Sequence, residues 1–288
     1  MSPTLPPYLN TVALLERYDR NGRSAGAGTC FFVRARDRYD PERESLFLVT
    51  NAHVIDKDFG QFDLLVPPIG GGLVRSFTVA AEIGTGAANW EVDREQDLAV
   101  LRLDGEHLPT DEIRRRSFDV DDDALALREL RRLRVGPGDE AFLVGFVLPQ
   151  ERGDRQCAGL RLATISRLTR RVEPRRSFIL EGVTLSGNSG SPVVLRRDRT
   201  NGGDAASGAA GKLIGTLCKH WHLASVIRTD ENGVPVEARE NVGRFQIAPV
   251  DVLRRLVDQV AADIYRAEVI EPTLRRWWGW LWGRRHPP

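Results

Sequence analysis

The stretch Gly187-Asn188-Ser189-Gly190-Ser191-Pro192 decides the fold that this chain is expected to adopt. It places a serine between two glycines, after the apolar run 178–180 and before the apolar run 193–195. A serine hydroxyl is a weak nucleophile at its ordinary pKa, so it needs a base and backbone N–H groups aimed at the oxyanion that it creates. Gly187 and Gly190 permit the tight turn and the close backbone approach that such a serine requires. The stretch therefore predicts a nucleophile on a turn between two strands.

Two further segments supply the partners that this serine needs. Thr50-Asn51-Ala52-His53-Val54 places a histidine after an apolar run, and Asp97-Leu98-Ala99-Val100-Leu101 places an aspartate before one. The order is His53, Asp97, Ser189, with separations of 44 and 92 residues. This is the chymotrypsin-type order, whereas α/β-hydrolases run Ser, Asp, His and subtilisins Asp, His, Ser. Each residue alone has an ordinary explanation as a turn serine, a strand-end histidine or a strand-start cap, but their joint order favours a catalytic set.

The three motifs resemble those of the trypsin-like (chymotrypsin-fold) serine proteases, in particular the bacterial branch with the Htr proteases and the glutamyl endopeptidases. The similarity extends over roughly residues 10–265. It implies a serine endopeptidase that hydrolyses peptide bonds of protein or peptide substrates through an acyl-enzyme, without a cofactor or metal. Ser189 would be the nucleophile, His53 the base and Asp97 the residue that orients it. The N–H groups of Gly187 and Ser189 would form the oxyanion hole.

The resemblance also indicates which residues bind the substrate. Counting back six residues from Ser189 places Val183 at the base of the primary pocket, and the wall would come from Cys218, Lys219 and His220. An apolar base favours a small or medium apolar side chain at the cleaved position. Lys219 or His220 would instead attract an acidic side chain if it faces the pocket, and the alternative is that both residues face the solvent.

Short runs rich in Val, Ile, Leu and Phe recur between turn signals, which is typical of an all-β barrel or sandwich. In the first barrel they predict strands at 12–15, 28–33, 46–50, 62–66, 73–80 and 98–103. With the resemblance, they predict two six-stranded antiparallel β-barrels and a C-terminal α-helix with apolar residues at helical spacing. In the second barrel, separate strands are expected at 212–218, 223–228 and 243–247, with a turn at Asn232-Gly233. The expected division is a flexible N-terminus (1–9), a first barrel (10–118), a linker (119–134), a second barrel (135–248), a helix (249–266) and a Trp/Arg-rich tail (267–288).

The residue before the serine bears on activation. Digestive members of the family carry an aspartate there, which pairs with a newly cut amino terminus. This chain has Asn188 at that position and no Ile-Val-Gly-Gly-like start. Because an asparagine side chain has no charge, we expect that the protein does not depend on this salt bridge for activity.

The composition places the chain among ordinary globular proteins. Its 288 residues are 41% hydrophobic with a net charge of +1, which permits a sizeable core and gives no overall bias toward nucleic acid or membrane. Arginine runs are interleaved with acids and lack a recognition motif, so we expect no nucleic-acid partner. Cys30, Cys157 and Cys218 are an odd number and far apart, which indicates reduced thiols in a cytoplasmic protein. Residues 1–7 show no signal-peptide pattern.

The tail is the second unusual feature, because it holds four of the six tryptophans of the chain. Paired arginines flank them, and this combination favours a membrane interface, here the inner membrane surface. The segment is too short to span a bilayer. Two alternatives stay open, a contact patch for a partner protein and docking back onto the barrels. The tryptophans are Trp277, Trp278, Trp280 and Trp282.

The sequence is therefore consistent with two functions. The first is an active serine endopeptidase. The alternative is a catalytically silent protease-fold binding or scaffold protein, in which the triad is present, the oxyanion hole is not formed, and the cleft or the Trp-rich tail binds a partner.

Overall fold

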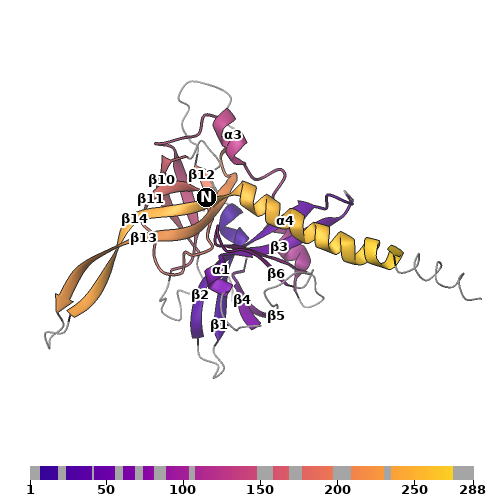
Figure 1. Cartoon of the computed structure of the whole chain (residues 1–288), viewed down its shortest axis with the longest axis horizontal. Helices are drawn as coiled ribbons and strands as arrows, with labels where there is room; N and C mark the ends of the chain where they lie inside the picture. The colour runs from indigo at the N-terminus through magenta and orange to yellow at the C-terminus, as the bar shows by residue number, and fades with distance from the viewer. Residues whose placement is uncertain are drawn as a thin grey trace, which may run out of the picture.

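A sheet of strands from the first part of the chain forms the first lobe of the molecule (Figure 1). The computed structural model describes residues 7–18, 24–40, 42–55, 61–68, 74–80, 89–103, 108–147, 158–168, 177–196, 209–229 and 235–274. At 7, 24–25, 61, 80, 222–229 and 235–240 it describes the backbone alone. The strands of this sheet run in the order β5-β4-β1-β2-β3-β7-β6, with β8 parallel to β2. They are β1 (Val12–Tyr18), β2 (Ser24–Arg36), β3 (Glu44–Thr50), β4 (Gln61–Val66), β5 (Arg75–Ala80), β6 (Trp90–Asp93), β7 (Leu98–Arg102) and β8 (Phe118–Asp119).

The second lobe is a closed antiparallel barrel in the order β10-β11-β14-β13-β12-β9. Its strands are β9 (Glu140–Gly145), β10 (Gly159–Arg167), β11 (Phe178–Gly182), β12 (Pro192–Arg196), β13 (Leu213–Thr229) and β14 (Pro235–Pro249). The helical elements are η1 (Pro7–Thr11), α1 (Ala52–Ile55), α2 (Thr110–Arg115), α3 (Leu127–Arg132), α4 (Val250–Tyr265) and η4 (Arg266–Ile270).

The all-β, double-barrel fold class is thus confirmed, but the first sheet has eight strands where six are expected. The two additional strands are β6, with four residues, and β8, with two. Neither strand contains an apolar run in its sequence. In β6 only Trp90 is fully buried, and β8 is a two-residue strand that pairs with β2. Their strand structure depends on neighbouring strands and not on their own sequence.

The apolar residues form one core inside each barrel and a third core between them. The first-barrel core contains Phe32, Leu48 and Trp90, and the second-barrel core contains Phe178 and Phe245. The core between the barrels takes alternate residues of the same strands together with the inner face of α4. These α4 residues are Val250, Val252, Leu253, Leu256, Val257, Val260 and Ile264.

The helix α4 runs from the junction of the barrels across the first lobe and projects beyond it (Figure 1). Helical structure continues past the expected end at residue 266, through η4 to residue 274. There the apolar side chains of Val269, Ile270 and Leu274 are 41–51% exposed. None of the described helices is long and apolar enough to cross a membrane. Trp277, Trp278, Trp280, Trp282 and Cys157 lie outside the described residues.

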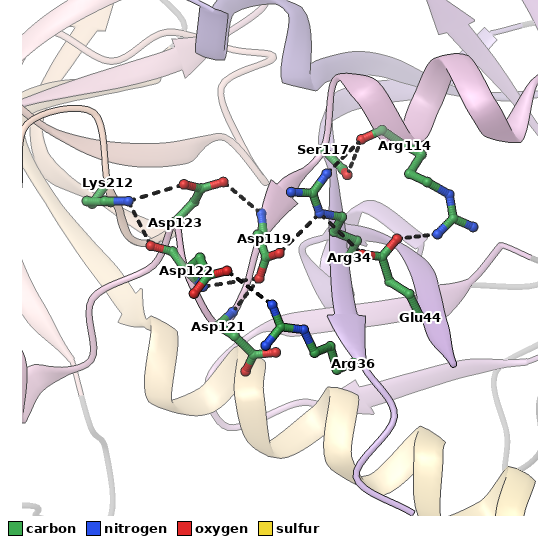
Figure 2. Close-up of polar contacts among 10 residues, drawn as sticks. All are labelled: Arg34, Arg36, Glu44, Arg114, Ser117, Asp119, Asp121, Asp122, Asp123 and Lys212. Carbon is green, nitrogen blue, oxygen red and sulfur yellow. Dashed lines mark hydrogen bonds and ion pairs between the residues drawn. The ribbon is translucent and has the colours of Figure 1, made fainter. Parts of the chain in front are cut away.

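The connection between the barrels is held to both of them (Figure 2). Asp119 accepts the backbone N–H groups of Asp121 and Asp122 and pairs with Arg34 of the first barrel at 3.2 Å. Burial raises the pKa of Asp119, but these donors outweigh burial and hold the pKa below its ordinary value. Lys212 of the second barrel donates to the carbonyl oxygen of Asp122 at 2.7 Å. The linker therefore fixes the two barrels relative to each other.

Candidate active site

His53 and Asp97 meet because their strands pair. His53 follows β3, Asp97 precedes β7, and these strands are antiparallel neighbours. The ring Nδ1 of His53 lies 2.6 Å from Oδ2 of Asp97, and the backbone N–H of His53 donates to Oδ1 at 2.9 Å. Asn51 donates to the backbone carbonyl of Asp97 at 2.8 Å. The carboxylate therefore holds both the ring and the backbone of the histidine.

Asp97 has a left-handed backbone conformation with φ of 52°. Aspartate tolerates this region better than most residues. A carboxylate bonded to Nδ1 favours the tautomer with the proton on that nitrogen, which leaves Nε2 as the basic atom. The side chain of His53 is 51% exposed, so Nε2 is not enclosed by the protein.

Ser189 lies on the turn between β11 and β12, as predicted. Just before Ser189, residues 185–188 form a β-turn in which the N–H of Asn188 donates to the carbonyl of Leu185. Gly187, at the third position of this β-turn, has φ of 93°. A type II turn requires this conformation. Gly190 has φ of 83°, and a Cβ there would lie 2.1 Å from the carbonyl oxygen of Thr29. Within the described chain, the N–H groups of Gly187 and Ser189 have no protein acceptor, as an oxyanion hole requires.

A threonine of the first barrel holds this turn of the second barrel. The N–H of Thr29 donates to the carbonyls of Gly187 and Ser189 at 3.0 and 2.9 Å. Its hydroxyl donates to Gly187 O at 2.6 Å and accepts the N–H of Phe146 at 3.0 Å. Thr29 is fully buried. It was not among the predicted site residues, because no local pattern marks a strand residue that bonds a turn 158 positions away.

Replacing Thr29 by valine is expected to lower kcat about 10- to 100-fold with little change in KM. The buried N–H of Phe146 loses its acceptor, at about 1–3 kcal/mol, and Gly187 O keeps only the backbone N–H of residue 29 as a donor. Thr29→Ser keeps the hydroxyl and should restore most of kcat. Steady-state kinetics on a peptide substrate measures both values. Thr11→Val is the matched control, since Thr11 is also buried and donates to a carbonyl, that of Tyr8, away from the turn. A similar kcat loss in the control would contradict a positioning role for Thr29.

His53, Asp97 and Ser189 line one cavity of about 400 Å³. Three of the four predicted substrate-binding residues line it too, namely Cys218, Lys219 and His220. The remaining lining residues are Arg94, Glu95, Gln96 and Gln246.

The structure does not bring Val183 to this cavity. Its side chain is 67% exposed and is not part of the cavity wall. The next residue, Thr184, is buried instead, and its hydroxyl lies 2.8 Å from Nδ1 of His220. Asn241 donates to the carbonyl and hydroxyl oxygens of Thr184. Thr184 therefore contacts His220, which lines the cavity, and the position of Val183 does not support the expectation of an apolar cleaved residue.

The described cysteines do not compete with Ser189 as nucleophiles. Burial, together with the charge of Asp97, raises the pKa of the Cys218 thiol to about 12. Burial also raises the pKa of Cys30 far above its ordinary value. Both are free thiols, and a thiol must ionise before it attacks.

Comparison with known proteins found one family model and a number of similar solved structures. The family model described as "Trypsin-like peptidase domain" matches residues 28–202. The crystal structure of the serine endoprotease from Yersinia pestis is 14% identical with a TM-score of 0.50, over 91% of this chain and 69% of that chain. The HtrA-type protease AlgW, solved with a decapeptide, is 16% identical with a TM-score of 0.49, over 88% of this chain and 65% of that chain.

The search of curated proteins found no match. At 14% identity the Yersinia structure shows a shared fold and no more. The family model covers more than half of the chain, including His53, Asp97 and Ser189. This chain belongs to the family of trypsin-like peptidases and is a serine endopeptidase.

Proposed function

We propose that this endopeptidase cleaves its substrates through a triad of Ser189, His53 and Asp97. The observation that carries the proposal is the arrangement of the three residues around one cavity. In it, Asp97 holds His53 through bonds of 2.6 and 2.9 Å.

The roles of the residues follow from their chemistry. Ser189 Oγ attacks the scissile carbonyl carbon while Nε2 of His53 takes the hydroxyl proton. The protonated ring then gives that proton to the leaving amine, and the acyl group stays on Ser189. A water molecule, deprotonated by His53, hydrolyses the ester and frees the serine. Asp97 keeps the proton on Nδ1 and stabilises the imidazolium in both halves of the reaction.

The N–H groups of Gly187 and Ser189 would bind the oxyanion of each tetrahedral intermediate. The left-handed conformation of Gly187 supports this role, because a type I turn would rotate the peptide between Ser186 and Gly187 by about half a turn. The carbonyl oxygen of Ser186 would then point into the oxyanion hole in place of the N–H of Gly187. One such donor contributes about 3–4 kcal/mol to the barrier.

The surroundings of Asn188 support activity without a newly cut amino terminus. Its side chain is fully buried. It donates to the carbonyl of Phe146 at 2.6 Å and accepts the N–H of Leu185 at 2.9 Å. These backbone partners satisfy the amide at both ends, so the turn needs no ammonium group to hold it.

A fluorophosphonate probe tests the proposed mechanism, because labelling requires an activated serine and a formed oxyanion hole. We expect the uncut protein to be labelled at Ser189. The alternative, a silent protease-fold scaffold that acts through its cleft or tail, would leave the folded protein unlabelled.

We also propose that the tail binds the inner surface of the cytoplasmic membrane. The exposed Val269, Ile270 and Leu274 lead into a segment in which arginines flank Trp277, Trp278, Trp280 and Trp282. Indole rings favour the headgroup level, and arginines favour anionic lipid. The free Cys30 and Cys218 fit the reducing cytoplasm.

Full-length protein should float with phosphatidylglycerol vesicles in a density gradient, and a version that ends at Glu271 should stay at the bottom. Binding should weaken in 0.5 M salt, because about 1 kcal/mol per basic residue is electrostatic. Equal behaviour of the two versions would rule out the membrane. A partner protein or docking onto the barrels would then be the role of the tail.

A further inference from the structure

A two-stranded ribbon, here called the arm, extends from the second barrel (Figure 1). It consists of residues 222–229 of β13 and residues 235–241 of β14, paired from His222 opposite Asn241 to Thr229 opposite Pro235. The neighbouring strands end before it begins, because β12 reaches only Thr216 of β13, and β11 reaches only Arg244 of β14. Among the described residues the arm therefore pairs only with itself. The sequence had predicted separate strands at 212–218 and 223–228, which are one strand here.

An isolated two-stranded ribbon is marginally stable in water, and its outer edges present unpaired backbone donors and acceptors. From residue 218 to residue 229, β13 contains no proline, so every position keeps its N–H group. Its register with β14 shifts between Leu217 and Lys219, between His220 and His222 and between Ala224 and Val226, so the open edge consists of short regular stretches. Such an edge is a template for a further strand.

This edge begins in the catalytic cavity. The turn that carries Ser189 occupies the edge at Leu217, whose N–H donates to Ser191 O at 2.9 Å and whose carbonyl accepts the N–H of Gly190 at 3.3 Å. The next residues of β13, Cys218, Lys219 and His220, line the cavity together with Ser189. From there β14 covers one edge of β13 along the arm, and no strand of the described part of the chain pairs with the other edge.

We propose that the arm is a binding site for the extended polypeptide that precedes the scissile bond. The inference rests on the proposed function. Because β13 runs outward from the cavity, a substrate strand in the preferred antiparallel direction runs inward, with its amino-terminal part on the arm and its carboxyl end at Ser189. Residues 218–229 would span about 40 Å, enough for about twelve substrate residues. Since main-chain groups supply the bonds, the substrate class is unfolded or extended segments of little sequence restriction.

Peptides with one cleavage sequence and 3, 6, 9 or 12 residues before it test the proposal on the intact protein. We expect kcat/KM to rise at least about tenfold from the shortest to the longest peptide, mainly through KM, because each added pair of backbone bonds contributes modestly. N-methylation of single added residues should reduce this gain at some positions and leave it unchanged at their neighbours, because bonded and non-bonded residues alternate within each regular stretch of an antiparallel strand. Equal kcat/KM at all lengths would overturn the proposal.

A variant in which Asn-Gly joins His222 to Asn241 removes the arm and keeps the cavity residues 218–220, since Asn-Gly closes a two-residue hairpin. It should cleave the shortest peptide like the intact protein and show no gain with length. If the variant does not fold, the N-methyl series on the intact protein decides the question by itself.

Two controls separate the remaining outcomes. Fluorescence anisotropy with Ser189→Ala measures binding of the same peptides without catalysis. Length-dependent binding without hydrolysis or probe labelling in the wild type would refute the proposed function and leave the arm as a peptide-binding site. Length-independent binding, together with a dimer that light scattering detects only when the arm is present, would assign the arm to a second copy of the chain and overturn the proposal.

Discussion

Replacing Ser189 by alanine is expected to lower kcat for peptide hydrolysis by about a millionfold, the scale known for loss of a triad serine. The change removes the only atom that can form the acyl-enzyme, so the remaining rate comes from the oxyanion hole and substrate binding. Labelling by a fluorophosphonate probe should disappear with it. Active-site titration followed by mass spectrometry measures the labelled fraction directly.

Ser191→Ala is the matched control for this experiment. Ser191 lies two residues further along the same turn, is fully buried, and its hydroxyl has no partner within the described chain. Its removal should leave labelling and kcat within about twofold, since a buried hydroxyl without a partner contributes no hydrogen bond. Full labelling of Ser189→Ala would identify a different nucleophile and contradict the proposed triad.

Replacing Asp97 by asparagine is expected to lower kcat by about 10⁴-fold, the loss known for this change in chymotrypsin-type triads. The amide can present N–H to Nδ1 of His53, which favours the proton on Nε2, where it blocks the acceptance of the serine proton. Asparagine also tolerates the left-handed conformation at this position, where φ is 52°. The fold should therefore persist, with a melting temperature close to that of the wild type.

Asp93→Asn controls for the loss of one negative charge near the site. Asp93 lies four residues before Asp97, accepts the N–H of Gln96 and pairs with Arg255, but it does not line the cavity. Its kcat should stay within about threefold of the wild type, since partly exposed ion pairs contribute little. If Asp97→Asn kept more than a tenth of the wild-type kcat, Asp97 would not be the residue that orients His53.

The sequence was most informative where function depends on local chemistry. Gly187 and Gly190 both adopt left-handed conformations that side chains disfavour, so their presence around Ser189 marks the turn directly. The helix α4 was equally clear, because its buried face repeats at helical spacing. The strands β6 and β8 were missed because their few residues form strands only by pairing with β7 and β2.

By itself, then, the sequence determined the double-barrel family, the order of His53, Asp97 and Ser189, and the uncharged Asn188 before the serine. Only the tertiary structure decided that Thr29 holds the turn of Ser189 from the other barrel and that Thr184 bonds His220. It also decided that β13 continues as one strand from the catalytic cavity into the arm. The physical reason is the distance along the sequence, because the signals for turns and helices involve residues that are only a few positions apart. A bond such as that from Thr29 to Gly187 joins positions 158 residues apart, and only the folded barrels bring them together.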